Sequence, residues 1–245
     1  MRVARVVTAL VLTAHGSADP RSAANARAVA RGLAKMRPGL DVRVAFLEHN
    51  SPNLVDVLHG LSPNDDAVVV PLLLANAYHA RVDIPRQIAA CAAPDRVRQA
   101  GVLGEDDRLV SVLRRRITAL GVSRLDESLG VLLVAIGASD PAVNARTARV
   151  APKLLAHTGW AGATTAFATG PERSLAEGIG RLRRQGAGRV VIAPWFLAPG
   201  RLPDRVQRFA QAAGIEMAAP LGAHRLVAET VLDRFDQATA QRIAA

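Results

Sequence analysis

Short apolar runs alternate along the chain with longer amphipathic segments that are rich in arginine. Apolar runs of this length, enriched in valine, predict buried strands, whereas apolar residues at every third or fourth position predict helices. The first half is expected to contain strands near residues 6–14, 42–47, 66–74 and 97–103, and helices near 21–36, 52–60, 82–92 and 106–120. Strands that alternate with helices in this way form parallel sheets with right-handed crossovers.

Turn and capping residues predict the boundaries of two of these helices. Pro38-Gly39 predicts the end of the helix over 21–36, because proline and glycine interrupt a regular helix. Ser51-Pro52 predicts the start of the next helix, with Ser51 as the N-cap and Pro52 in the first turn.

The two halves of the chain repeat one pattern. VLTAHGSADP at 11–20 resembles LLVAIGASDP at 132–141, since each is an apolar run followed by glycine, a small residue and Asp-Pro. Three further pairs of blocks match in the same order: 44–58 with 165–179, 67–80 with 189–202, and 102–113 with 220–232. The second half is therefore expected to repeat the strands, near 130–136, 163–168, 188–196 and 214–219. These matches indicate an internal duplication with a short joint near 121–129.

The duplication predicts an α/β protein with two similar lobes, at residues 1–124 and 125–245. Each half is too short for a full dinucleotide-binding fold and fits a small four-stranded parallel sheet flanked by helices. A β-α-β-α-β start of flavodoxin type gives the strand order 2-1-3-4. In such a sheet, ligands bind at the carboxyl ends of the strands where the order reverses, which here lies between the first and third strands.

The N-terminal residues allow two interpretations. Arg2 and Arg5, followed by VVTALVLTA, resemble the charged and apolar parts of a signal peptide. The matching apolar run at 131–136 lies inside the chain, where it cannot be a cleaved signal, so we expect 6–14 to be the first strand. No stretch of the sequence approaches the roughly 20 apolar residues of a membrane-spanning helix. No membrane partner is therefore expected.

Composition narrows the classes of ligand. Half of the 245 residues are apolar, 3% are aromatic, and the formal net charge is +10. The positive excess favours an anionic ligand, but no zinc-finger, RNP or helix-turn-helix pattern supports nucleic acid as a partner. Cys91 is the only cysteine, which excludes an internal disulfide and favours a reducing, cytoplasmic location. The sequence leaves the oligomeric state open between a monomer and a weak homodimer.

Three side chains are expected to converge at the reversal point of the first lobe. His15 follows the first strand, His79 follows the third strand by a few residues, and Glu48 follows the second strand. Two imidazoles and a carboxylate suit a divalent metal such as Fe²⁺, Co²⁺ or Ni²⁺, and these groups can also accept protons near neutral pH.

The repeat supplies an internal control for this site. The second half has Ile136 opposite His15, Leu202 opposite His79, and approximately Thr169 opposite Glu48. A role in maintaining the fold would more plausibly have been kept in both copies. The asymmetry therefore favours chemistry in the N-terminal half.

Two motifs carry a family resemblance. The segments TAHGS at 13–17 and PLLLANAYHARVDIP at 71–85 resemble the sirohydrochlorin chelatases of sirohaem and cobalamin biosynthesis. These belong to the class II chelatase superfamily, which includes the protoporphyrin ferrochelatases. The resemblance covers essentially the whole chain and implies a cleft between two lobes that binds the metal and assists loss of the pyrrole protons. It assigns those roles to His15, His79 and Glu48.

The chain departs from the family at one place. Members often have glycine shortly before the second histidine, where this chain has Ala77-Tyr78, which implies a different loop backbone. Protoporphyrin ferrochelatases keep their site in the second half of the chain, so a site in the N-terminal half disfavours them.

The implied substrate is a tetrapyrrole rich in carboxylates, which arginines can bind through paired hydrogen bonds. Its expected binding residues flank the site or come from the opposite lobe: Arg21, Tyr78, Arg81, Arg86 and Arg201. Solvated helix arginines and a packing role for Tyr78 remain equally open interpretations.

The sequence favours an ATP-independent lyase that inserts Fe²⁺ or Co²⁺ into sirohydrochlorin, with no permanently bound cofactor. No G-x-G-x-x-G or Walker loop follows the first strand, so a nucleotide is not expected. Two alternatives stay open: a metal or tetrapyrrole carrier without turnover, and a regulatory module that binds a small anion. The choice between iron and cobalt also stays open, because both accept histidine and carboxylate ligands.

Overall fold

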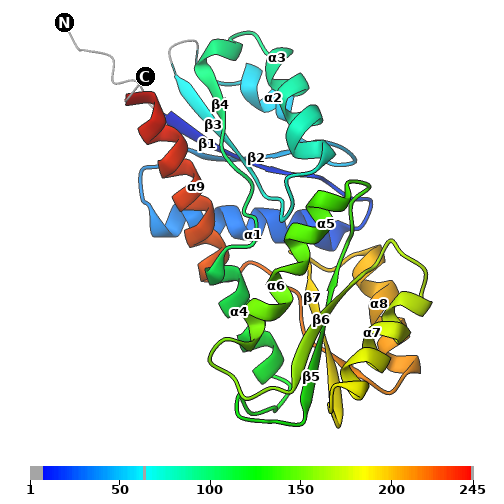
Figure 1. The fold of residues 1–245 in the computed structure, drawn as a ribbon. Helices are drawn as coiled ribbons and strands as arrows, with labels where there is room; N and C mark the ends of the chain where they lie inside the picture. Colours follow the sequence, from blue (N-terminus) through cyan, green and yellow to red (C-terminus); the bar gives the residue numbers. More distant parts are fainter. Residues whose placement is uncertain (1–7, 63–64, 244–245) are drawn as a thin grey trace, which may run out of the picture. The chain divides into compact units, whose positions relative to one another are not determined.

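The computed structural model describes residues 8–62 and 65–243, and it contains two four-stranded parallel sheets flanked by helices (Figure 1). The strand orders are β2-β1-β3-β4 and β6-β5-β7-β8, which confirms the expected α/β fold with two similar lobes and the flavodoxin-type order. The first two residues of the strand expected over 6–14 lie outside the described residues. Within the described part, no helix is long and apolar enough to cross a membrane.

The first sheet has β1 at its centre, paired in parallel with β2 and β3. Its strands are β1 (Thr8–Ala14), β2 (Val42–Phe46), β3 (Asp66–Pro71) and β4 (Val97–Gln99). The segments between and after them form α1 (Pro20–Met36), α2 (Leu54–His59), a π-helical turn (His79–Asp83), α3 (Ile84–Ala89) and a 3₁₀ turn (Pro94–Arg96). All residues of β3 are buried, as expected for a strand covered on both faces.

The second sheet repeats this arrangement around β5. Its strands are β5 (Leu129–Ala135), β6 (Gly162–Phe167), β7 (Arg189–Trp195) and β8 (Glu216–Met217). Its helices include α5 (Pro141–Ala148), α6 (Val150–Leu155), α7 (Arg173–Arg184) and α8 (Arg201–Ala212). The break between α5 and α6 lies at Arg149, three residues before Pro152. In a continuous helix, Pro152 could not donate to the carbonyl of Ala148, and its ring would clash with that carbonyl.

Two helices are exchanged, in the sense that each packs in the unit built from the other half of the chain: α4 (Asp107–Thr118) and α9 (Arg225–Ile243). α9 packs against α1 and β3, whereas α4 packs against α6 and β7. The chain therefore divides into one compact unit up to Gly104 that includes the residues from Arg225, and a second unit from Glu105 to His224. These units differ from the lobes expected at 1–124 and 125–245, because a matched repeat does not show which sheet a connecting helix covers.

One predicted helix start is wrong. α2 begins at Leu54, and its N-cap is Asn53, whose side chain accepts a hydrogen bond from the backbone N–H of Asp56. Ser51 and Pro52 precede the cap and are joined by a cis peptide bond. Asparagine is as good an N-cap as serine, and Asn53 caps the helix in place of Ser51.

Candidate metal centre

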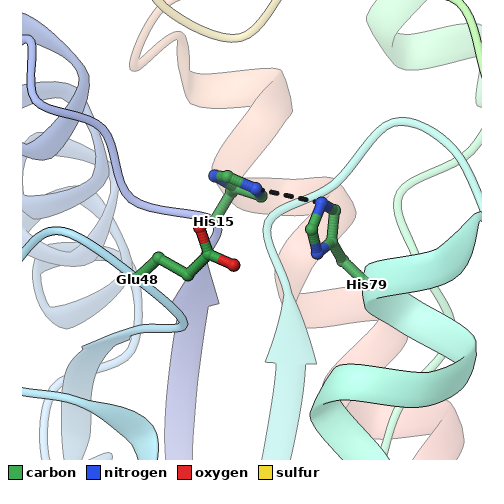
Figure 2. A group of neighbouring side chains, drawn as sticks. All are labelled: His15, Glu48 and His79. Atoms are coloured by element: carbon green, nitrogen blue, oxygen red, sulfur yellow. Dashed lines mark hydrogen bonds between the residues drawn. The ribbon is translucent and has the colours of Figure 1, made fainter.

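His15, Glu48 and His79 meet at the carboxyl ends of neighbouring strands (Figure 2). His15 directly follows β1, Glu48 lies two residues beyond β2, and His79 begins the π-helical turn after β3. One ligand atom of each side chain lies within 4.8 Å of the other two. The two imidazoles are partly buried and Glu48 is exposed, so the cluster can be reached from solvent.

A tight glycine turn sets His15 beside Glu48. The backbone N–H of Glu48 donates to the carbonyl of His15 at 2.9 Å. Gly16 has φ +92°, and a Cβ at this position would lie 1.8 Å from the carbonyl oxygen of Glu48. Only glycine fits this position, because any side chain would force the two loops apart.

The π-helical turn positions His79. The backbone N–H of Ile84 donates to the carbonyl of His79, which is the wider hydrogen bond of a π turn. The side-chain amide of Gln99, on β4, donates to the carbonyl of Ala80 at 2.7 Å and ties the turn to the sheet. π turns are frequent at functional sites.

Hydrogen bonds at the far side of each ring define the imidazole tautomers. His15 Nδ1 lies 2.8 Å from the carbonyl oxygen of Gly16, and His79 Nδ1 lies 2.6 Å from Asp83 Oδ2. Since both of these oxygens only accept, each Nδ1 carries the proton and each neutral ring has its lone pair on Nε2. The two Nε2 atoms lie 3.0 Å apart (Figure 2). A divalent metal between the two Nε2 atoms would accept both lone pairs.

Asp83 is a residue of this site that the sequence analysis missed. It lies four residues after His79, and the two side chains form an ion-pair contact when the imidazole is protonated. The His-x-x-x-Asp spacing within one helical turn was the available signal. It was overlooked because the helix was expected to begin at residue 82, after His79.

Glu48 has a second neighbour besides the two histidines. His49 Nε2 lies 3.5 Å from Glu48 Oε2, and His49 has φ +60°. The side chains of both residues are about half exposed. The carboxylate of Glu48 is therefore accessible from solvent.

The second lobe keeps the scaffold of this site without its ligands. The backbone N–H of Thr169 donates to the carbonyl of Ile136 at 3.0 Å, which repeats the bond between Glu48 and His15. Gly137 has φ +92°, as Gly16 does.

The register of the third strand of each sheet extends the correspondence to His79. Pro71 pairs with Thr13 in the first sheet, and Pro194 pairs with Val134 in the second. Counting onward from these prolines places Leu202 where the first lobe has His79. The second lobe therefore carries isoleucine, threonine and leucine at the three positions.

The expected substrate-binding residues lie at several places. Tyr78 is 59% exposed and its ring lies edge-on to His79, with centroids 6.0 Å apart. Arg81 and Arg86 are exposed on the π-helical turn and on α3. Arg21 is exposed at the start of α1, where its guanidinium binds Asp19 at 2.6 Å. Arg201 is exposed at the first position of α8, in the second unit.

Comparison with known proteins agrees with the duplicated fold. A family model described as CbiX matches residues 9–120 and matches again at residues 130–238. The chain belongs to the CbiX family. The two CbiX matches fall on the two halves of the repeat, as the duplication predicts.

Relatives of this CbiX chain include two curated proteins of Priestia megaterium. A sirohydrochlorin ferrochelatase is 30% identical over 209 residues, covering 81% of this chain and 76% of the relative. A sirohydrochlorin cobaltochelatase is 26% identical over 215 residues, covering 81% and 67%. The structure of SirB from Bacillus subtilis with Fe³⁺ has the same fold, with a TM-score of 0.80 at 24% identity over 98% of both chains. The resemblance to sirohydrochlorin chelatases is thereby confirmed.

Proposed function

We propose that the chain is a sirohydrochlorin chelatase, a lyase that inserts Fe²⁺ or Co²⁺ into sirohydrochlorin without ATP. The observation that carries the proposal is the cluster of His15, Glu48 and His79, whose ligand atoms lie within 4.8 Å of one another. Imidazole and carboxylate ligands suit both metals. Relatives named for this reaction with each metal agree with the assignment.

The reaction exchanges a divalent metal for the two pyrrole protons of the macrocycle. His15 and His79 receive the metal through Nε2, since Nδ1 of each ring is committed to an oxygen acceptor. Once the metal moves onto the pyrrole nitrogens, the freed Nε2 atoms and the carboxylate of Glu48 can accept the released protons. The partial burial of the imidazoles and the exposure of Glu48 suit the carboxylate to pass protons on to solvent.

The positive charge of the chain fits a polycarboxylate substrate. The formal net charge is +10, and it raises the local concentration of an anionic tetrapyrrole. Tyr78, Arg81 and Arg86 are exposed next to the metal cluster or on the helix that follows it. We assign them, with Arg21 and Arg201, as candidate contacts for the substrate's carboxylates and ring.

An anaerobic absorbance assay tests the proposal. Sirohydrochlorin is mixed with Fe²⁺, Co²⁺ or Ni²⁺, with and without protein, and its spectrum is followed over time. A chelatase accelerates metalation over the protein-free rate with at least one metal and turns over many equivalents. Binding of sirohydrochlorin or metal without acceleration would replace the proposal with a carrier function.

A further inference from the structure

The carboxylate of Asp83 is committed to His79. Asp83 Oδ2 lies 2.6 Å from His79 Nδ1, and the Asp83 side chain is only 20% exposed. Asp83 stands at the N-cap position of α3 but makes no capping hydrogen bond with its side chain, so helix capping does not account for it. Short contacts between an imidazole and a carboxylate are the stronger class of hydrogen bond.

We propose that Asp83 is a positioning residue for the metal site: it holds His79 in the tautomer and orientation that present Nε2 to the metal. An ionised carboxylate only accepts hydrogen bonds, so it fixes the proton on Nδ1 and leaves the lone pair on Nε2. Such a partner also fixes the orientation of the imidazole ring. This inference concerns metal binding. It depends on the proposed function only for the identity of the reaction in which the bound metal takes part.

The two histidines are oriented by different kinds of acceptor. His15 Nδ1 faces a backbone carbonyl, that of Gly16, whereas His79 Nδ1 faces a side-chain carboxylate. Of these two acceptors, only the one facing His79 can be removed by substituting a side chain. His15 keeps its partner in any side-chain variant, so the effect of Asp83 can be isolated by substitution.

Asp83 acts through His79 in this arrangement and is not itself a metal ligand. It hydrogen-bonds to Nδ1, while the metal-facing atom of the ring is Nε2. The group of ligand atoms within 4.8 Å contains His15, Glu48 and His79 and leaves Asp83 out.

Co²⁺ binding in the absence of tetrapyrrole tests the proposal, with the full chain titrated by calorimetry and by the visible absorption of the bound ion. Asp83→Ala is expected to weaken Co²⁺ binding by about 10- to 100-fold, the usual effect of losing such a partner. Asp83→Asn, whose amide oxygen still accepts from Nδ1, is expected to fall between Asp83→Ala and the parent protein. The absorption bands at saturation should keep their shape, because the ligands are unchanged.

Asp41→Asn is the matched control. Asp41 also pairs with a side chain, Arg43, but it precedes β2 and so lies at the opposite end of the strands from the site. The Asp41→Asn variant should leave Co²⁺ affinity unchanged. Thermal unfolding of each variant checks the fold, and Asp83→Asn keeps the test available if Asp83→Ala unfolds.

Three results would overturn the inference. Unchanged Co²⁺ affinity in folded Asp83 variants would exclude a positioning role. Altered absorption bands would make Asp83 a direct ligand. An equal loss of affinity in Asp41→Asn would indicate a general charge effect.

Steady-state assays with sirohydrochlorin should show a raised KM for the metal and a smaller change in kcat. A protein that binds Co²⁺ without metalating sirohydrochlorin would contradict the proposed function and leave the role of Asp83 intact.

Discussion

The Nε2 atoms of His15 and His79 lie 3.0 Å apart, although the two residues follow different strands. Each ring is turned by an acceptor at Nδ1, at 2.8 Å and 2.6 Å, so both Nε2 lone pairs point at one place. Two neutral imidazoles would repel each other in this geometry. A metal cation placed between the rings would accept both lone pairs.

His15→Ala should abolish most metal binding, because it removes one of the two converging nitrogens. Losing a residue that only orients a ligand can weaken metal binding by about 100-fold. Losing a ligand should weaken Co²⁺ binding by more than this and should lower the metalation rate to a similar extent. Calorimetry with Co²⁺ and the sirohydrochlorin assay measure the two effects.

His59→Ala is the matched histidine control for this variant. His59 ends α2 in the same unit and is exposed, outside the metal-ligand group. It should leave both measurements unchanged. Near-normal metalation by folded His15→Ala would contradict the assigned site.

Glu48→Gln separates ligand and proton-acceptor roles of the carboxylate. The side chain is 51% exposed, so solvent can replace part of its contribution, and the loss of metal affinity should be smaller than for His15→Ala. If Glu48 accepts pyrrole protons, kcat falls more than the KM for the metal rises. His49→Ala, which removes the neighbour at 3.5 Å, should alter neither parameter strongly. An unchanged kcat in Glu48→Gln would show that Glu48 does not accept the pyrrole protons, and His15 and His79 would then be the proton acceptors.

Much of this site follows from the sequence because parallel topology is restrictive. Once the apolar runs are identified as strands, the order 2-1-3-4 brings the carboxyl ends of the first three strands together, and with them His15, Glu48 and His79. Asp83 could not be placed in the same way, since its role depends on a π turn that begins before the predicted helix. The repeat pattern could not predict that α4 and α9 pack against the sheet of the other half. The amphipathic pattern of a helix shows which of its faces is buried, but not which sheet that face covers.

Gly16→Ala should damage the site through the backbone. The positive φ costs about 1–3 kcal/mol for a residue with a side chain, and the added Cβ would overlap the carbonyl oxygen of Glu48. Gly137→Ala is the matched variant, because Gly137 has the same φ and its Cβ would lie 2.4 Å from Thr169 Oγ1. Both variants should lower the urea midpoint, but only Gly16→Ala should lower Co²⁺ affinity. Equal losses of affinity would show that the effect is global.

The exchanged helices predict where core substitutions act. Phe235 on α9 is 5% exposed, and Phe235→Ala should cost about 3–5 kcal/mol. Leu113 on α4 is fully buried, and Leu113→Ala should cost about 2–5 kcal/mol. Amide hydrogen exchange should accelerate in α1 and β3 for Phe235→Ala and in α6 and β7 for Leu113→Ala. The reverse pattern would contradict the division of the chain into these units.

The second lobe offers a test of how much of the metal site the common scaffold supplies. Its backbone repeats the glycine turn at Gly137, but it differs where the first lobe has the π-helical turn. Leu202 lies in the first turn of α8, a regular helix that begins at Arg201. A histidine introduced at this position would therefore project from a different local backbone.

The triple variant Ile136→His, Thr169→Glu and Leu202→His should not create a second tight site. Counting from the paired prolines puts Val206 where the first lobe has Asp83, and Val206 is fully buried in the core of the second unit. An introduced imidazole would have no carboxylate to fix its tautomer, so binding at the new site should be about 10- to 100-fold weaker than at the natural one. Co²⁺ titration should thus still give one tight site per chain. Two sites of equal affinity would mean that the glycine turn and strand ends suffice, without the π turn or the acidic partner.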